Sequence, residues 1–173
     1  MSTPVQTFQK YFSFEKEMGR EGIWVYVTRR DAESKAVPAG MERNIAATAS
    51  LQLGPEDMLI KDLTVNPSCA VPYDDGLEQG DLRSLRAIYS RRFPMLYAAA
   101  MAAALSRAYY YGCSMVRGYL SPEEVRVLPR LFPLTCHGRR EYSGYTAQIL
   151  DRAAQRMPVL HELIVLASEQ LDG

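Results

Sequence analysis

The sequence has no excess charge of either sign, because 20 acidic side chains balance 20 basic ones over 173 residues. Without a basic surface the chain has little to hold a phosphate backbone or an anionic bilayer, so we predict no nucleic-acid partner. Long apolar runs are also missing. The longest, residues 94–105, falls well short of the ~20 residues that cross a bilayer, so no transmembrane segment is expected.

Cysteine and histidine are scarce, with three and two residues respectively. Cys69, Cys113 and Cys136 lie far apart and have no neighbour at the spacing of metal ligands, which predicts reduced thiols and no metal site. The N-terminal stretch has no apolar signal core. Both features predict a cytoplasmic protein.

Motifs of several enzyme classes are absent as well. The chain contains no G-x-x-x-x-G-K-[ST], G-x-G-x-x-G, H-E-x-x-H or G-x-S-x-G. We interpret His137 and His161 as structural or surface histidines. Cys136 and His137 are adjacent, and neighbours on a strand point to opposite faces, so they are not expected to form a nucleophile and base.

What the chain does have is a 47% apolar content, enough for one domain over residues 1–173 to bury a core. Apolar spacing near the helical period predicts a first helix over residues 7–20. Residues rich in β-branched and apolar side chains predict a meander of three strands. These strands are residues 23–29, 45–53 and 58–65, with a turn at 54–57 and long loops at 30–43 and 66–82.

A second half of different character begins with a possible helix at 83–89 and then a helix from near Pro94 to Gly112. This helix is rich in alanine and has only Arg107 as a charged residue, so we expect it to be buried. Pro94 suits a first helical turn, and Gly112 suits a C-terminal cap. The elements predicted after it are a strand at 113–120, a short helix from 121 that ends before 133, a strand pair at 131–137 and 142–149, and a helix at 158–171.

This order of elements resembles the GNAT N-acyltransferase superfamily over roughly residues 20–152. IKDLTV stands at the place of the family's fourth strand, SRRFPMLYAAAMAAALSRAYYYG at its central helix, and CSMVRGYLSPEEVRVLPRLF at the strand and helix that follow. RLFPLTCHGRREYSGYTAQILDR looks like the C-terminal stretch of the long-chain N-acyl amino acid synthase and autoinducer synthase branch. The resemblance implies a mixed α/β fold: a central, mostly antiparallel sheet, a buried central helix and flanking helices.

The resemblance also implies a thioester donor, acyl-CoA or an acyl carrier protein, bound at the start of the central helix. The matching donor-binding positions are Arg91, Arg92, Phe93, Met95 and Leu96. This segment departs from the family's Q/R-x-x-G-x-G/A because it has no glycine. Two guanidinium groups suit phosphate binding. Equally, they suit a solvated turn before a buried helix, so either donor, or none, fits the segment.

For catalysis the resemblance points to Asp62, within IKDLTV, where burial would make its carboxylate a stronger base. The alternative is a strand residue turned to solvent beside Lys61. Tyr111, at the end of the central helix, is a candidate proton donor, although aromatic core packing is the favoured interpretation of such tyrosines. The predicted acyl and acceptor pocket consists of Val65, Met115 and Tyr142.

The sequence thus predicts an N-acyltransferase that moves an acyl group, fatty acyl by preference, to a small-molecule amine such as an amino acid. The rival hypothesis is a catalytically silent GNAT-like module that binds a protein or ligand as a regulator. The missing glycines favour that rival.

Overall fold

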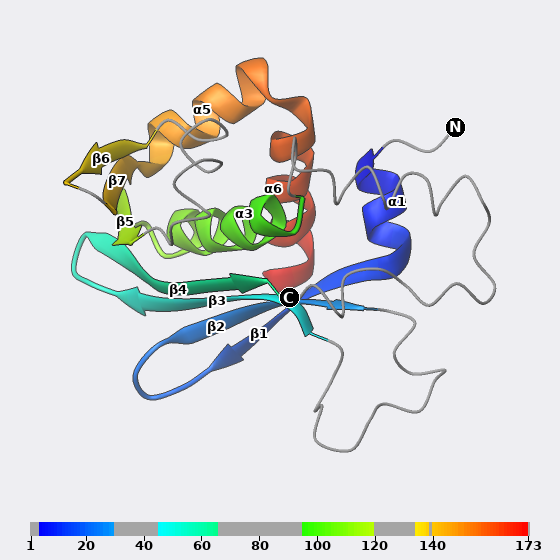
Figure 1. Ribbon diagram of the computed structural model, residues 1–173, viewed down its shortest axis with the longest axis horizontal. Helices are drawn as coiled ribbons and strands as arrows, with labels where there is room; N and C mark the ends of the chain where they lie inside the picture. Colours follow the sequence, from blue (N-terminus) through cyan, green and yellow to red (C-terminus); the bar gives the residue numbers. More distant parts are fainter. Residues whose placement is uncertain (1–3, 30–44, 66–94, 120–133, 139, 173) are drawn as a thin grey trace.

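The computed structural model describes residues 4–29, 45–65, 95–119, 134–138 and 140–172, which form a seven-stranded sheet with helices packed on it (Figure 1). The strand order is β1-β2-β3-β4-β5-β7-β6, and every neighbouring pair is antiparallel except β4 and β5. The expected α/β class, with a buried central helix and flanking helices, is confirmed. That one domain spans residues 1–173 stays a prediction.

The strands are β1 (Phe12–Met18), β2 (Ile23–Arg29), β3 (Ile45–Leu53), β4 (Asp57–Val65), β5 (Met115–Tyr119), β6 (Thr135–His137) and β7 (Glu141–Tyr145). The described helices are α1 (Pro4–Tyr11), α3 (Met95–Tyr110), α5 (Thr146–Arg156) and α6 (Pro158–Leu171). The three strands predicted for the meander, β2 to β4, are therefore confirmed. The loops at 30–43 and 66–82 and the helices at 83–89 and 121–132 lie outside the described residues.

The first helix is shorter than predicted, because residues 12–18 form strand β1 and only residues 4–11 are helical. Phe12 and Phe14 are buried on one face of β1, which is an alternation of period two. The strand pairs along its whole length with β2, from Phe12 opposite Arg29 to Met18 opposite Ile23. That pairing across the hairpin outweighs the approximate helical spacing of the aromatic residues, so the prediction of a helix over 7–20 was wrong beyond residue 11.

Helix α3 forms the centre of the molecule, as its alanine content predicted. It packs against β2, β3 and β4 on one side and against α5 and α6 on the other. Its C-terminus is closed by Gly112, whose φ of 71° lies in the left-handed region. The Cys113 N–H donates to the Ala108 carbonyl (2.8 Å) and the Gly112 N–H to the Tyr109 carbonyl (3.1 Å), a Schellman cap. Among the described residues, no helix is long and apolar enough to cross a membrane.

Arg107, the one charged residue of α3, is fully buried and is satisfied by the end of α6. Its Nη1 donates to the Leu171 carbonyl at 3.3 Å, and its Nη2 is ion-paired with Asp172. Lys16 Nζ donates to the same Leu171 carbonyl at 2.5 Å. Positive charge at the C-terminus of a helix complements its dipole, so this cluster attaches α6 to both α3 and β1.

The C-terminal part differs from the prediction at one boundary. β6 and β7 form the expected strand pair, but residues 146–149 begin helix α5 and do not continue the strand. Ile149 and Ala153 are buried four residues apart, which is the spacing of one helix face. The final helix, α6, has the bounds that the sequence predicted, residues 158–171.

Candidate functional site

Strand β4 contains a β-bulge at Lys61. Ile60 lies opposite Leu51 of β3, whereas Asp62 lies opposite Ser50, so Lys61 is an extra residue with no partner on β3. The bulge explains why Lys61 and Asp62 are both exposed although they are consecutive on a strand. A bulge bends the strand that carries it, so β4 changes direction at this point.

Within the described residues, the pairing of β4 with β5 ends at the bulge. Their parallel pairing runs from Asp57 opposite Met115 to Ile60 opposite Gly118 and then stops. Residues 62–65 of β4 continue to pair with β3, but no described strand pairs with the other edge of residues 61–65. We call this edge of residues 61–65, beyond the end of the pairing with β5, the β4–β5 gap. A strand edge without a partner presents backbone donors and acceptors to an extended ligand.

Gly118 and Tyr142 stand at the point where the two strands part. A Cβ on Gly118 would lie 2.7 Å from the Ile60 carbonyl oxygen and 2.8 Å from the Tyr142 hydroxyl. Only glycine allows both atoms to approach so closely. Tyr142, opposite Gly118 on β7, is buried, so its side chain crosses β5 and brings a hydroxyl to the closed end of the gap.

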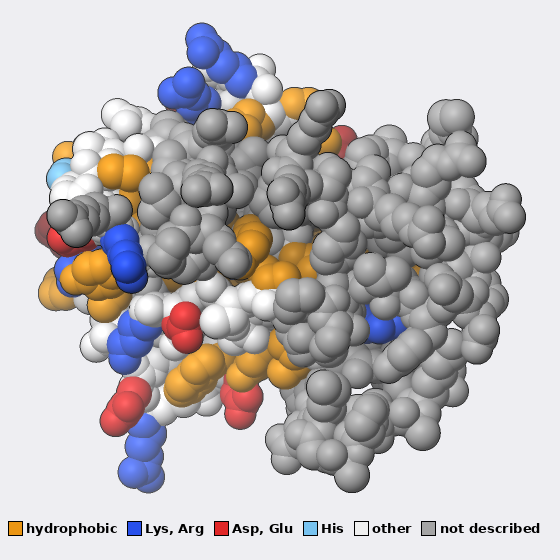
Figure 2. Space-filling model, in the orientation of Figure 1, with side chains coloured by type: hydrophobic (Ala, Val, Ile, Leu, Met, Phe, Trp, Pro, Cys, Tyr) orange, Lys and Arg blue, Asp and Glu red, His pale blue; other side chains and the backbone are white. Residues whose placement is uncertain are grey.

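The face of the gap toward α3 is apolar. Leu63 of β4 is buried, Val65 packs against the same core, and Leu96 in the first turn of α3 is buried too. Helix α3 runs antiparallel to β4, since Ser114, just past its C-terminus, donates to Glu56 at the start of β4. The N-terminus of α3 therefore lies toward the open end of the gap (Figure 1). Figure 2 shows hydrophobic side chains at the centre of the same view, where Figure 1 draws α3 above the sheet.

The donor-binding prediction is only partly within the described residues. Arg91, Arg92 and Phe93 lie outside them, and so does the side chain of Met95, although its backbone begins α3. Leu96 is placed as described above. The charged part of the predicted donor site stays a prediction.

Asp62 is not buried, contrary to the expectation that a low-polarity setting would strengthen it as a base. The bulge turns it to the sheet face opposite α3, in line with Ser50 and Trp24, whereas the next residue, Leu63, faces inward. The alternative interpretation, a strand residue turned to solvent, is therefore right about its exposure. Its carboxylate still stands at the edge of the gap.

Two other predicted residues lie away from the gap. Tyr111 follows the C-terminus of α3, where its hydroxyl donates to the Met18 sulfur at 3.7 Å. Met115 begins β5 opposite Asp57, where β4 and β5 are still paired. Both are at the closed end of the strand pair, so the structure does not bring them together with Asp62 or Val65. Only Val65 and Tyr142 of the predicted pocket border the gap.

Cys113 is a buried thiol at the base of β5. Burial, and next the negative charge of Asp57, raise the pKa of Cys113 above its ordinary value of 9.0. A raised pKa means a smaller thiolate fraction at any pH below that range, so this thiol is a poor nucleophile. We expect iodoacetamide at neutral pH to alkylate exposed Cys136 well before Cys113, as read by peptide mass mapping.

The variant Asp57→Asn gives a control, because it removes the smaller of the two causes. Its Cys113 should be alkylated somewhat faster, but still more slowly than Cys136. Equal rates at the two thiols in the unmodified protein would contradict the assignment.

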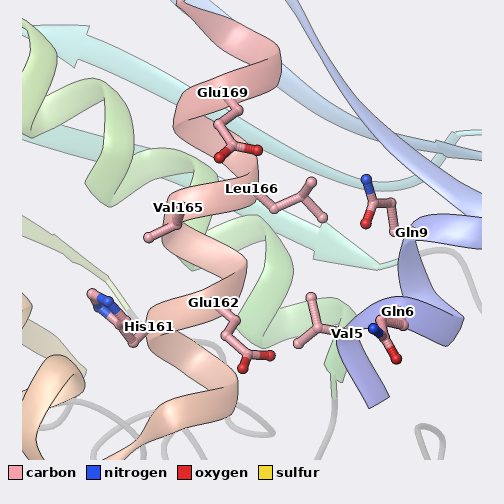
Figure 3. Close-up of a pocket in the computed structure, with 8 residues that line it drawn as sticks. All are labelled: Val5, Gln6, Gln9, His161, Glu162, Val165, Leu166 and Glu169. Atoms are coloured by element: carbon pink, nitrogen blue, oxygen red, sulfur yellow. The ribbon is translucent and has the colours of Figure 1, made fainter. Parts of the chain in front are cut away.

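A separate groove of about 460 Å³ lies between α1 and α6 (Figure 3). Leu166 extends from α6 toward Gln9 of α1, and Glu162 and Glu169 line the groove along α6. His161 is exposed on the same helix, in agreement with its interpretation as a surface histidine. The lining contains no residue of β4 or β5. The groove is therefore distinct from the β4–β5 gap.

Sequence reasoning missed one polar pair. His137 Nε2 lies 2.8 Å from the Ser143 hydroxyl oxygen, across the β6–β7 hairpin. The signal that would have found it is the hairpin around Gly138, which brings residues six apart in the sequence face to face. No group of three or more acidic, histidine or cysteine side chains within the described ranges is arranged to hold a metal.

Comparisons with known proteins do not assign this chain to a family. No family model matches it, and no curated protein does. Among solved structures, a mutant of a cAMP-binding acyltransferase from Mycobacterium smegmatis aligns with 88% of this chain and 40% of its own, at 11% identity and a TM-score of 0.43. The chain thus spans less than half of that protein. A likeness at this level assigns neither a family nor an activity.

Proposed function

We propose that this protein is an N-acyltransferase that moves an acyl group from a thioester donor, acyl-CoA or an acyl carrier protein, to an amine. The observation that carries the proposal is the β4–β5 gap, where a bulge and the end of parallel pairing leave one edge of residues 61–65 without a described partner strand. The donor's pantetheine arm is a chain of suitable length that contains amide groups. Such a chain can add to a strand edge through backbone hydrogen bonds.

The chain has apolar residues that suit the acyl end of such a donor and basic residues that suit its phosphate end. Leu63, Val65 and Leu96 make the core beside the gap apolar, and we propose that the acyl chain lies on this side, which favours a fatty acyl group. Arg91 and Arg92 directly precede α3 in the sequence, so we assign them the donor's phosphate groups. This part of the proposal rests on the sequence alone.

The chemistry requires a proton acceptor for the amine and stabilisation of the thioester oxygen and leaving thiolate. The amine nitrogen attacks the thioester carbonyl, a C–N bond forms and the C–S bond breaks. We propose that the Asp62 carboxylate accepts the proton from the amine, which enters from the sheet face opposite α3. The Tyr142 hydroxyl, at the closed end of the gap, supplies a proton to the thiolate. We assign Tyr111 no role in this reaction, because it lies at the other end of α3.

The test is release of free thiol from acyl-CoA of several chain lengths and from acyl carrier protein, with amino acids as acceptors. Asp62→Asn should lower the rate by about a hundredfold, the lower part of the range for a positioned base. It should leave the stabilisation by donor in a thermal-shift assay unchanged. Asp151→Asn, an exposed carboxylate on α5, is the matched control and should keep full activity.

Absence of turnover with every donor and acceptor would overturn the enzyme proposal. Donor binding without turnover would favour the silent regulatory module instead. The absence of glycine in the segment before α3 also supports that hypothesis. No stabilisation by any of the donors would remove the donor site as well.

A further inference from the structure

A row of polar side chains crosses β5, β7 and β6 on the sheet face opposite the buried Tyr142. Arg117 of β5 lies directly opposite Ser143 of β7, and Glu141 of β7 lies opposite His137 of β6. Side chains of paired residues point to the same face of a sheet. Nucleophile, base, acid and cation types are therefore gathered on one exposed surface that has no part in the β4–β5 gap.

The closest contact in this row joins Ser143 and His137. The serine oxygen and the imidazole Nε2 are 2.8 Å apart, which is the separation of an activated nucleophile and its base. The hairpin holds the two residues in place, because Gly138, with a φ of 68°, begins the turn that sets the β6–β7 register. The pair is exposed, so a small solute reaches it directly.

Two charged residues occupy neighbouring positions of the strand register around the pair. Arg117 lies opposite Ser143 in the strand register, and its Nε donates to Asp57 of β4 at 2.6 Å, on the other side of β5. Glu141 of β7 lies opposite His137 of β6, on the same face of the sheet.

We propose that Ser143 is a second reactive site, a nucleophile that accepts acyl groups from small activated esters with His137 as its base. In the step, the Ser143 oxygen attacks the ester carbonyl and His137 Nε2 takes the hydroxyl proton. The bond from the carbonyl to the leaving oxygen breaks, and that oxygen receives the proton from His137. The product is an acyl ester on Ser143, which water then hydrolyses by the same route in reverse.

The test uses the intact protein and p-nitrophenyl acetate, with nitrophenol release and peptide mass mapping as readouts. We expect one acetyl group on the peptide that contains Ser143. Ser143→Ala should remove it, and His137→Gln should slow its formation by about a hundredfold, as expected for loss of a general base. Ser114→Ala is the matched control, since Ser114 is an exposed serine whose hydroxyl donates to the Glu56 carbonyl, and this variant should leave labelling unchanged.

Three results would overturn the proposal: acetyl groups only on lysine, histidine or the amino terminus, labelling of Ser143 that persists at full rate in His137→Gln, or no labelling of Ser143. Circular dichroism of the variants shows that each keeps its fold. The outcome is independent of the proposed N-acyltransferase activity, because neither CoA nor an amine acceptor is present and Asp62→Asn should be labelled normally.

Discussion

Arg107→Ala should lower the free energy of unfolding by about 2–5 kcal/mol, the cost of truncating a large, fully buried side chain. The arginine is completely buried on α3, and its removal leaves the Leu171 carbonyl without its guanidinium donor and Asp172 without its counter-charge. The guanidinium also lies 4.7 Å above the Tyr110 ring, so packing is lost as well. Urea denaturation, followed by circular dichroism, measures the change.

Arg117→Ala is the matched control, because Arg117 also pairs with an aspartate but its side chain is 46% exposed. Exposed pairs contribute about 0–1 kcal/mol, so this variant should be nearly as stable as the parent. A loss from Arg107→Ala no larger than that from Arg117→Ala would contradict the structural role of Arg107. Asp172→Asn should also destabilise the fold, because it leaves the fully buried Arg107 guanidinium without its counter-charge.

Gly118→Ala is expected to have the second large effect, on both stability and donor binding. Its Cβ would lie 2.7 Å from the Ile60 carbonyl oxygen, a backbone atom that moves only with β4 itself. Overpacking of this kind costs about 1–3 kcal/mol. Relief requires β4 or Tyr142 to shift at the closed end of the gap. We therefore also expect loss of the stabilisation that acyl-CoA gives in a thermal-shift assay.

Gly22→Ala separates these two effects. Its Cβ would meet the Leu51 carbonyl oxygen at 2.4 Å, in the turn between β1 and β2, with β3 between this turn and β4. It should destabilise the fold comparably and leave the response to acyl-CoA intact. Combining Gly118→Ala with Tyr142→Phe should recover part of the lost stability, because one of the crowded atoms is removed. Equal loss of donor response in Gly22→Ala and Gly118→Ala would refute a local role for Gly118.

The parts of the fold that were predictable are those in which the pattern is local. The alanine run identified α3 as buried, and a stripe of apolar residues set the bounds of α6. Gly112 marked the end of α3 for the same reason, since a helix cap depends on residues that are close in the chain. Residues 12–18 were not predictable in this way, because their partner β2 determines that they form a strand.

For the site, too, only the features that depend on one segment could be predicted from the sequence. The sequence pointed to the segment IKDLTV and to Tyr142, and the structure places both at the β4–β5 gap. It did not reveal that Asp62 is exposed, because the bulge at Lys61 arises from the register between β3 and β4. Nor did it join Ser143 with His137, which depends on the β6–β7 hairpin.

By itself, then, the sequence determined the α/β class, the identity of the buried helix and the position of the final helix, since each follows from composition and short-range periodicity. The tertiary structure decided where the chain opens and which side chains meet there. A bulge, the end of a parallel pairing and a contact between neighbouring strands are properties of two segments at once, so no single segment carries their signal.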